Sequence, residues 1–213
     1  MDDKEIQNLR RQYSKSTLSV SSVSKDPFKQ FEKWFQDVLN SGFLEPNAMT
    51  LATASKTGKP SARVVLLKGI HDGGFVFYTN YKSKKGKDIE ENPYGCLLFY
   101  WDKLERQIRI EGKIEKVSQK ESEEYFNTRP YKSRVGAWAS KQSSVIESRS
   151  AIVKEFLKYM VKFKTHVPLP DVWGGYSLTP DTFEFWQGRP NRLHDRVRYT
   201  KNRSGWKIER LAP

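Results

Sequence analysis

The chain has 213 residues, a formal net charge of +13 and a hydrophobic fraction of 37%. This length and composition suit a globular domain that buries a sizeable core. No apolar run approaches the length of a membrane-spanning helix, and residues 1–25 lack the apolar stretch of a secretory signal. We therefore expect an intracellular, cytoplasmic protein that is neither secreted nor bound to a membrane.

Cysteine and histidine usage limits the redox and metal chemistry. The single cysteine, Cys96, cannot form an internal disulfide, and its apolar neighbours predict a buried, inert thiol in a reducing compartment. His71, His166 and His194 are far apart and have no Cys or carboxylate cluster at metal-ligand spacing. We therefore expect no metal site.

The positive charge predicts an anionic ligand. A basic surface attracts nucleic acids, phosphorylated metabolites or acidic membranes. The Lys and Arg residues are scattered without a run of five, however, and no nucleic-acid-binding motif is recognisable. We therefore expect no nucleic acid partner. A nucleic-acid-binding module stays as the alternative class of protein.

The first predicted elements are helical. Residues 1–25 are polar and rich in serine, which predicts a mobile segment that is able to form a short helix over Leu9–Tyr13. Asp26 and Pro27 suit the cap and the first turn of a longer helix, which ends near Gly42. The apolar residues of this helix recur at helical spacing: Phe28, Phe31, Phe35 and Val38.

From residue 48 the pattern changes to strands. Five segments bounded by turn residues are predicted strands: 48–54, 61–70, 73–80, 95–101 and 106–117. Ser118 and Glu121 form a capping box for a helix that reaches Phe126 and stops near Pro130. A further helix is expected over 147–163. Four more strands are expected: 176–178, 182–186, 196–200 and 206–211.

These elements predict an α+β fold. Short antiparallel strands that close on themselves, with helices outside, are typical of a β-barrel. No internal repeat is visible. A GxGxxG sequence after a strand and a GxxxxGK[ST] sequence are both absent, so Rossmann and P-loop sites are excluded.

The stretch RVVLLK places two cations in one predicted strand. Alternation divides its six residues between two faces: Arg63, Val65 and Leu67 on one, and Val64, Leu66 and Lys68 on the other. The two cations are either strand-end charges that reach solvent or contacts to two separate anions.

A lysine pair follows the next predicted strand. The strand ends at Tyr78 and Thr79, and Ser83 then caps a short helix with Lys84 and Lys85 in its first turn. A helix N-terminus already carries partial positive charge, so two cations there make sense if a phosphate neutralises both. A solvated lysine run is the alternative.

The stretch YFNTRPYKSRVGAWASKQSS offers an arginine among neutral donors. Tyr125, Arg129 and Ser133 are spaced four apart, so they share a face if the helix continues, and they can converge even across a break. A phenol, a guanidinium and a hydroxyl together suit a phosphate monoester. Gln142 and Ser143 add further neutral donors.

The stretch FWQGRPNRLHDR is dense in cations beside Trp186. Alternation in its second half puts three cationic side chains on one face of a strand: Arg192, His194 and Arg196. Leu193 lies on the opposite face, and Asp195 is placed to pair with a neighbouring arginine. One such cation has a structural explanation, but three beside a tryptophan favour an anionic, planar ligand.

In this order and spacing, these motifs resemble the pyridoxine 5′-phosphate oxidase family. The resemblance runs from about Leu9 to Pro213, and its most specific pieces are RVVLLK, FYTN, SKKGK, LERQIRIEG, YFNTRP, GAWASKQSS, VWGGY, EFWQGRPNRLHDR and WKIERLAP. It implies a single FMN-binding split β-barrel domain with surrounding helices over residues 26–213. It also implies a homodimer with FMN bound between the subunits.

The resemblance also implies the site residues. The flavin contacts would be Arg63, Val64, Val65, Leu66, Tyr78, Thr79, Lys84, Lys85, Gln107, Gln142, Ser143, Trp186 and Arg196. The substrate contacts would be Lys68, Tyr125, Arg129 and Ser133 at its phosphate, and Arg192, Leu193 and His194 around its ring. Arg192 and His194 would be the catalytic residues. Arg10 and Tyr13 would belong to a lid over the site.

The implied activity is oxidation of pyridoxine 5′-phosphate and pyridoxamine 5′-phosphate to pyridoxal 5′-phosphate, a step of vitamin B6 metabolism. A hydride would pass to FMN, O2 would reoxidise the flavin to give hydrogen peroxide, and the amine would also release ammonia. Lys84 stands where an arginine is usual, which keeps the charge but loses the planar fork. Arg134 stands where the residue is often neutral. The competing interpretation is a split-barrel flavoprotein that binds FMN but reduces another substrate or only stores flavin.

Overall fold

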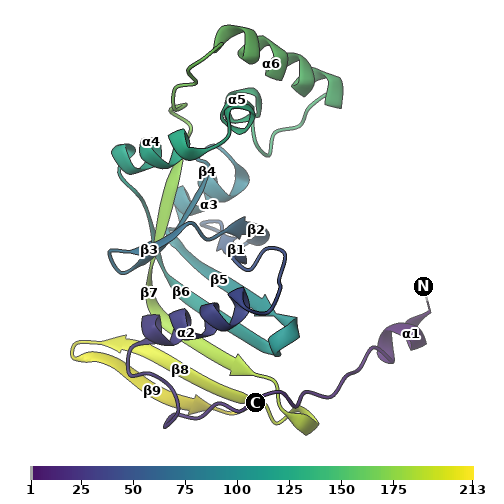
Figure 1. Ribbon diagram of the computed structural model, residues 1–213, viewed down its shortest axis with the longest axis vertical. Coiled ribbons are helices and arrows are strands. Elements are labelled where there is room, and N and C mark those ends of the chain that lie inside the picture. The colour runs from purple at the N-terminus through teal and green to yellow at the C-terminus, as the bar shows by residue number, and fades with distance from the viewer. Residues whose placement is uncertain (1) are drawn as a thin grey trace. The chain divides into compact units, whose positions relative to one another are not determined.

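The computed structural model describes residues 2–213, which form two compact units. Unit 1 comprises residues 2–46, 97–110 and 181–213, and unit 2 comprises residues 47–96 and 111–180. Figure 1 labels the helices and strands of both units. No helix of the described residues is long and apolar enough to cross a membrane.

The described residues combine a nine-stranded sheet with six α-helices. The strands are β1 Ala48–Ala54, β2 Pro60–Leu66, β3 Gly69–His71, β4 Gly74–Asn80, β5 Tyr94–Trp101, β6 Arg106–Lys116, β7 Trp173–Gln187, β8 Asp195–Asn202 and β9 Gly205–Leu211. The helices are α1 Asp3–Gln7, α2 Pro27–Leu39, α3 Lys84–Glu91, α4 Gln119–Thr128, α5 Tyr131–Ala139 and α6 Arg149–Lys162, with 3₁₀ turns η1 Asp102–Leu104 and η2 Pro190–Arg192. Hydrogen bonds join the strands in the order β2-β1-β5-β6-β7-β4-β3, with β8 on β7 and β9 on β8.

In unit 2, β1 and β2 form an antiparallel hairpin with Leu51 opposite Arg63. Every second residue of β1 is buried, because successive side chains of a strand point to opposite faces. β4 pairs antiparallel with both β3 and β7, and Tyr78 lies opposite Gly175. These pairings place Arg63 and Tyr78 on strands whose register is fixed by neighbours.

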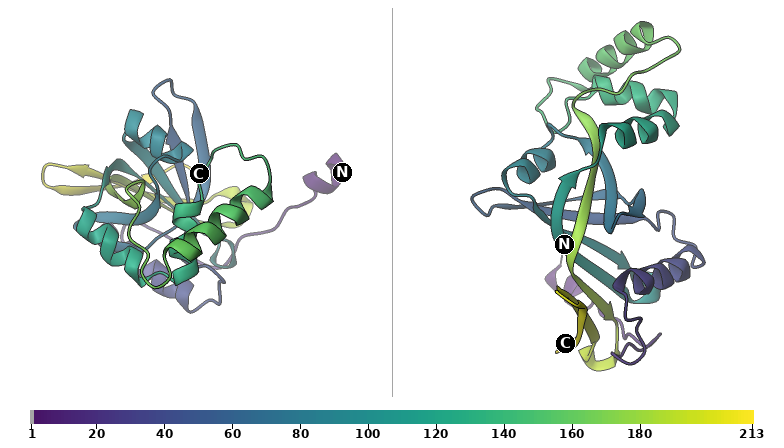
Figure 2. Two further views of the ribbon diagram at one scale, coloured as in Figure 1. Left: turned by 90° about the horizontal axis from the view of Figure 1, so that it is seen from above. Right: turned by 90° about the vertical axis from the view of Figure 1, so that its left-hand side faces the viewer.

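Helices α4, α5 and α6 of unit 2 surround an apolar cluster. Its buried members are Phe126, Val135, Phe163, Val167 and Trp173. Burial of a large apolar side chain contributes roughly 2 kcal/mol. Figures 1 and 2 both show α5 and α6 side by side. The cluster therefore holds in place the start of β7 and the end of α4.

In unit 1, α2 forms where the sequence predicts it. The Asp26 carboxylate accepts a hydrogen bond from the N–H of Phe28 at 2.9 Å and so caps the helix. Its apolar face is buried, and the rings of Trp34 and Phe185 meet edge to face with centroids 5.3 Å apart. Phe185 lies one residue before Trp186, so α2 supports that end of β7.

The short helix expected over Leu9–Tyr13 is wrong, since the helical residues lie earlier, at Asp3–Gln7. Beyond them, the N–H groups of Ser14 and Lys15 both donate to the Glu105 carboxylate, at 2.9 and 3.0 Å. The acceptor for these N–H groups is therefore a distant side chain and not the preceding turn of a helix. The expectation of a mobile N-terminal segment followed by one domain stays a prediction.

Segment 61–70 forms two strands, not one, because its hydrogen-bond partner changes. The N–H of Leu67 donates to the carbonyl of Asn47 at 2.9 Å, but the N–H of Lys68 donates to the carbonyl of Val76 at 2.8 Å. Val76 belongs to β4. The first strand, β2, therefore pairs with β1, and the second, β3, pairs with β4.

The separate strands expected at 176–178 and 182–186 are one continuous strand, β7. Pro180 lies inside it, although proline removes a donor from the ladder. Gly112 on β6 lies directly against this stretch, and a Cβ at that position would be 2.1 Å from the carbonyl oxygen of Thr179. Glycine therefore permits the close approach of two backbones.

Candidate functional site

Unit 2 contains a cavity of about 390 Å³ formed by residues of β2, β4, α3, α4 and β7 and by nearby loops. Its lining residues are Val64, Val65, Leu66, Lys68, Tyr78, Thr79, Lys85, Tyr125, Arg129, Gln142 and Trp173. All of them except Trp173 are among the residues that the sequence indicated. The cavity thus gathers members of both expected groups, whose roles stay predictions. The signal for Trp173 was only its place before two glycines in VWGGY.

The first turn of α3 has the predicted cap, since the Ser83 hydroxyl accepts the N–H of Gly86 at 3.3 Å. The two lysines that follow differ in their surroundings. Lys84 is half-exposed and binds the carboxylate of Asp88, one turn later. Lys85 is only 8% exposed. The alternative of a solvated lysine run therefore fails for Lys85.

Among residues 2–213, the hydrogen-bond acceptors of the Lys85 ammonium are all neutral. It donates to Thr79 Oγ1 at 3.1 Å and to Gln142 Oε1 at 3.0 Å. Burial, and then the charge of Arg63, lower the pKa of Lys85 to about 8. A buried cation without a carboxylate favours an anionic ligand.

Arg63 does not line the cavity, but it lies close enough to act on Lys85. Its guanidinium donates to the carbonyl of Leu51 at 3.1 Å, to Thr53 Oγ1 at 2.8 Å and to Ser61 Oγ at 2.5 Å. These bonds hold it against the β1–β2 hairpin. Val64, the next residue, is 65% exposed and faces the cavity.

Three aromatic side chains also line the cavity. The rings of Tyr78, Tyr125 and Trp173 are nearly parallel, with interplanar angles of 5° to 16°. The Arg129 guanidinium lies 4.6 Å from the centre of the Trp173 ring. Its Nη1 is buried and has no hydrogen-bond partner within residues 2–213, and burial lowers the pKa of Arg129. An oxyanion in the cavity would satisfy this donor.

The expected trio of Tyr125, Arg129 and Ser133 lies on two helices. A new helix, α5, which the sequence reasoning missed, begins directly after Pro130. Tyr125 and Arg129 line the cavity, whereas Ser133 is exposed on α5 and does not. Ser143 is exposed as well and has a left-handed φ of 70°.

The second predicted group lies in unit 1, where Trp186 is the penultimate residue of β7. The strand expected over 192–196 is wrong in its first half, because β8 begins only at Asp195. Arg192 closes the turn η2 with a left-handed φ of 61°. The N–H of Leu193 donates to the carbonyl of Pro190 at 3.2 Å, which holds this turn. Arg192 and His194 therefore do not alternate along a strand.

His194 lies against Trp186, with ring centroids 4.6 Å apart. Its Nδ1 accepts the N–H of Arg189 at 3.2 Å, so the neutral ring carries its proton on Nε2. Burial, and then the charge of Arg192, lower the pKa of His194. The imidazole is therefore neutral near pH 7 and presents Nε2 as a donor.

The N-terminal segment contacts this same group within unit 1. The Tyr13 ring meets the Trp186 and His194 rings edge-on, at 5.8 and 5.6 Å. A second cavity, of about 360 Å³, is lined by Arg10, Arg11, Gln12, Tyr13, Arg189, Asn191 and Arg192. The two expected lid residues thus share a cavity with Arg192. A role in covering substrate stays a prediction.

The remaining predicted residues of unit 1 lie on strands. The Arg196 side chain donates to the buried Glu184 at 2.7 Å and to the carbonyl of Ala212 at 2.8 Å. Gln107 is half-buried on β6, and Leu193 is 66% exposed. Asp195 binds Arg189, at 3.3 Å, and Arg210, so its expected pairing with a neighbouring arginine is confirmed.

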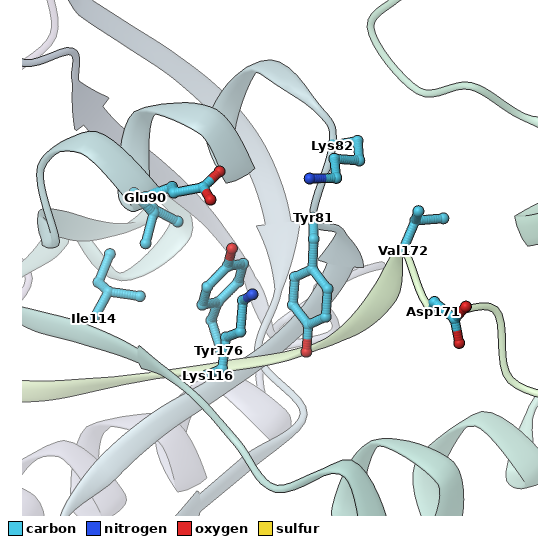
Figure 3. Close-up of a pocket in the computed structure, with 9 residues that line it drawn as sticks. Tyr81, Lys82, Glu90, Ile114, Lys116, Asp171, Val172 and Tyr176 are labelled. Atoms are coloured by element: carbon cyan, nitrogen blue, oxygen red, sulfur yellow. The ribbon is translucent and has the colours of Figure 1, made fainter.

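A further cavity of unit 2, about 250 Å³ in volume, contains none of the predicted residues. Figure 3 shows the rings of Tyr81 and Tyr176 beside Lys116, with Glu90 on one side and Asp171 on the other. Cations and carboxylates are mixed here. The 390 Å³ cavity, in contrast, has cationic and neutral side chains only.

Comparison with known proteins adds two family matches. Residues 35–161 match the model of a family described as "Pyridoxamine 5′-phosphate oxidase". Residues 173–213 match a "Pyridoxine 5′-phosphate oxidase C-terminal dimerisation region". Together these matches include the residues of the 390 Å³ cavity and the Trp186–Arg196 stretch.

Curated relatives and solved structures agree with these matches. The chain is 52% identical to a "Pyridoxine/pyridoxamine 5′-phosphate oxidase" of Burkholderia thailandensis, over 98% of this chain and 99% of the relative. PhzG of Burkholderia lata, solved with tetrahydrophenazine-1-carboxylic acid, superimposes with a TM-score of 0.87 at 28% identity, over 93% and 98% of the two chains. A pyridoxamine 5′-phosphate oxidase-related, FMN-binding protein of Nostoc punctiforme superimposes at 0.70 and 17% identity, over 90% and 100%. These likenesses confirm the expected α+β split β-barrel fold.

Proposed function

The chain belongs to the pyridoxamine 5′-phosphate oxidase family, and from this premise we propose that it oxidises pyridoxine 5′-phosphate and pyridoxamine 5′-phosphate to pyridoxal 5′-phosphate. O2 would be the electron acceptor and hydrogen peroxide a product, with ammonia released from the amine. The name of the relative at 52% identity supports this choice of substrates. The enzyme would act in vitamin B6 synthesis and salvage.

The observation that carries the proposal is the 390 Å³ cavity. Its lining includes two buried or partly buried cations from different elements, Lys85 on α3 and Arg129 after α4, and no carboxylate. Two phosphates, one on FMN and one on the substrate, require two such groups. Lys68, exposed beside the cavity, adds a third cation.

The residues present fit FMN. Lys85 is a buried ammonium without a counter-ion, and Arg63 lies near it, so a phosphate dianion would satisfy both. We propose that FMN is held by Arg63, Val64, Val65, Leu66, Tyr78, Thr79, Lys84, Lys85, Gln142 and Ser143, together with Gln107, Trp186 and Arg196. Trp186 and Arg196 lie in the segment that matches the dimerisation region. We therefore propose a homodimer with FMN at the interface between subunits.

The substrate phosphate would be bound by Lys68, Tyr125, Arg129 and Ser133. The unpartnered Nη1 of Arg129 supports a direct bond to a phosphate oxygen. Bound FMN would supply the acceptor for the hydride that leaves the 4′ carbon. The contribution of the protein is to hold the two rings in a reactive geometry.

Arg192 and His194 would act at the substrate ring, with Leu193 beside them. The neutral His194 would donate a hydrogen bond from Nε2 to the oxygen or nitrogen on the 4′ carbon. Its Nδ1 is already engaged by the backbone of Arg189. Arg192 would orient the ring, since it lies two residues before His194 in the turn η2 and lines the 360 Å³ cavity.

An anaerobic absorbance spectrum tests the proposal. Flavin bands that bleach with pyridoxine 5′-phosphate and return with air would support cofactor and reaction together. A colourless protein that FMN fails to reconstitute would refute both. The likeness to PhzG gives a second candidate, a flavoprotein that binds a reduced phenazine carboxylate. Bleaching by tetrahydrophenazine-1-carboxylic acid but not by the vitamer phosphates would favour it.

A further inference from the structure

A carboxylate lies among the cations of the proposed cofactor site. Asp88 of α3 is 2% exposed. Its Oδ2 accepts hydrogen bonds from Thr53 Oγ1 at 2.8 Å and from Ser61 Oγ at 2.7 Å, and its Oδ1 accepts one from Lys84. Burial by itself would raise the pKa of Asp88, but these three hydrogen bonds outweigh it and lower the pKa. Asp88 is therefore ionised.

The two hydroxyls link Asp88 to Arg63. A hydroxyl has a single hydrogen, and Thr53 and Ser61 each direct theirs to Asp88. Each oxygen therefore offers only lone pairs to Arg63, which donates to both. The direct distance between Arg63 Nη2 and Asp88 Oδ2 is 3.8 Å, so the hydroxyls carry the contact. We refer to Thr53 and Ser61 as the hydroxyl relay.

This arrangement leaves two N–H groups of the Arg63 guanidinium available to bind a ligand. Of its five N–H groups, two on Nη1 and one on Nη2 have acceptors among residues 2–213. The Nε–H and the second Nη2–H are not used by any of these hydrogen bonds. They form the edge that binds oxyanions in a bidentate manner.

Asp88 also separates the roles of the two lysines. Lys84 is neutralised by Asp88, and it is absent from the cavity lining. Lys85 lines the cavity and has no carboxylate partner. Of the two lysines, Lys84 is therefore the one with a counter-ion.

We propose that Asp88 is a positioning residue of the cofactor phosphate site, which orients Arg63 through the hydroxyl relay and binds Lys84, so that Arg63 and Lys85 contact the phosphate directly. Lys84, although a member of the proposed FMN group, would then act on the cofactor only through Asp88. The inference rests on the proposed function. It predicts in which direction Asp88 changes the affinity for FMN. A carboxylate near a phosphate repels it, so a carboxylate that acts by charge alone would weaken cofactor binding, whereas a positioning carboxylate strengthens it.

The test compares FMN with riboflavin, which lacks the phosphate. The full-length apo-protein is titrated with each flavin, and quenching of flavin fluorescence gives Kd. In Asp88→Asn a single amide oxygen replaces the two carboxylate oxygens, so it cannot accept both the relay hydrogens and Lys84, and the neutral side chain no longer fixes Arg63 and Lys84 together. We expect the Kd for FMN to rise about tenfold, with the Kd for riboflavin unchanged. Tighter FMN binding, or an equal loss for both flavins, would overturn the proposal.

Matched variants separate the relay from charge and from folding. Ser61→Ala keeps the Asp88 charge and removes one relay hydroxyl, so it should also weaken FMN selectively, even if Asp88→Asn proves unstable. Ser55→Ala removes an exposed hydroxyl of the same hairpin and should leave Kd unchanged. Glu90→Gln removes a charge from the same helix away from the relay, and should not weaken FMN.

Two failures remain distinguishable. If the unmodified chain binds neither flavin, the proposed function fails and this inference fails with it. If the unmodified chain binds FMN and both Asp88→Asn and Ser61→Ala bind it equally well, only this inference fails. Asp88→Glu keeps the carboxylate on a longer stem, and we expect a Kd between those of the unmodified chain and Asp88→Asn.

Discussion

Tyr78 of β4 and Tyr125 of α4 stack face to face, with ring centroids 3.9 Å apart and planes inclined by 16°. Tyr78 also donates a hydrogen bond to the Glu121 carboxylate at 3.3 Å, and burial, followed by that carboxylate, raises the pKa of Tyr78. Its phenol therefore stays protonated. Because Tyr78 belongs to the proposed flavin group and Tyr125 to the proposed substrate group, one aromatic stack joins the two groups.

Arg129→Ala should raise KM for pyridoxine 5′-phosphate by about tenfold or more, with little change in kcat. The reason is that the guanidinium would bind a phosphate remote from the reacting carbon. Steady-state kinetics measure this. Lys132→Ala, an exposed cation on α5, is the control for a general loss of charge. An unchanged KM in Arg129→Ala would remove Arg129 from the phosphate site.

Arg192→Ala should lower kcat/KM by roughly a thousandfold while FMN stays bound. Arg192 is proposed to orient the substrate ring, and its loss leaves the cofactor residues intact. Kinetics and the flavin absorbance of the same sample check both halves. Arg203→Ala, in the exposed turn between β8 and β9, should match the unmodified enzyme. Near-normal turnover by Arg192→Ala would contradict its role.

FMN affinity should fall as pH rises above about 8. Lys85 has a pKa of about 8 in the folded apo-protein, and a phosphate dianion needs its charged form. Flavin titrations between pH 7 and 9.5 measure this, with Lys85→Met as the control, which should bind FMN weakly and without this step. A flat profile for the unmodified chain would show that Lys85 does not bind the phosphate.

The free energy of unfolding of the apo-protein should rise with pH, whereas the affinity for FMN falls. Between about pH 8 and the ordinary lysine pKa of 10.5, the unfolded chain binds more protons at Lys85 than the folded chain. The contribution of this residue to the free energy of unfolding therefore rises with pH across that window. Urea titrations of the apo-protein, compared with Lys85→Met, isolate the contribution. A contribution that falls with pH would contradict the lowered pKa.

Gly188→Ala should loosen the N-terminal segment. A Cβ at position 188 would lie 2.8 Å from Cγ of Tyr13, which is closer than real contacts allow. Trypsin should then cleave faster after Arg10 and Arg11. Gly136→Ala, where an added Cβ meets nothing within 4 Å, is the control. Equal cleavage rates in both variants would show that Tyr13 does not anchor the segment.

The sequence predicted the elements that depend on local signals. The cap at Asp26, the cap at Ser83 and the Ser118 half of the predicted capping box form as expected, because each uses a side chain within three residues of the N–H that it binds. The Glu121 carboxylate of that box instead accepts the hydroxyl of Tyr78. In β1 every second side chain is buried, and this alternation is likewise set by the local geometry of the chain. For such elements the nearest neighbours in the chain determine the structure.

The missed features depend on distant groups. The turn at Arg192 has a left-handed residue that is not glycine, and it is stabilised by the bond between Arg189 and His194, which alternation does not reveal. From the sequence alone, Asp88 is an ordinary helical carboxylate one turn after Lys84, with no sign of a role in the site. Its position beside Thr53 and Ser61 arises only when α3 packs on the β1–β2 hairpin.

The uncompensated ammonium of Lys85 has a consequence for the life of the protein in the cell. Burial of a cation without a counter-ion costs folding free energy, and a ligand that neutralises it returns that free energy to the folded state. Newly made chains would thus depend on flavin supply for resistance to unfolding. When flavin is scarce, a larger share of the chains would be exposed to proteases, so the supply of flavin would influence the abundance of the enzyme.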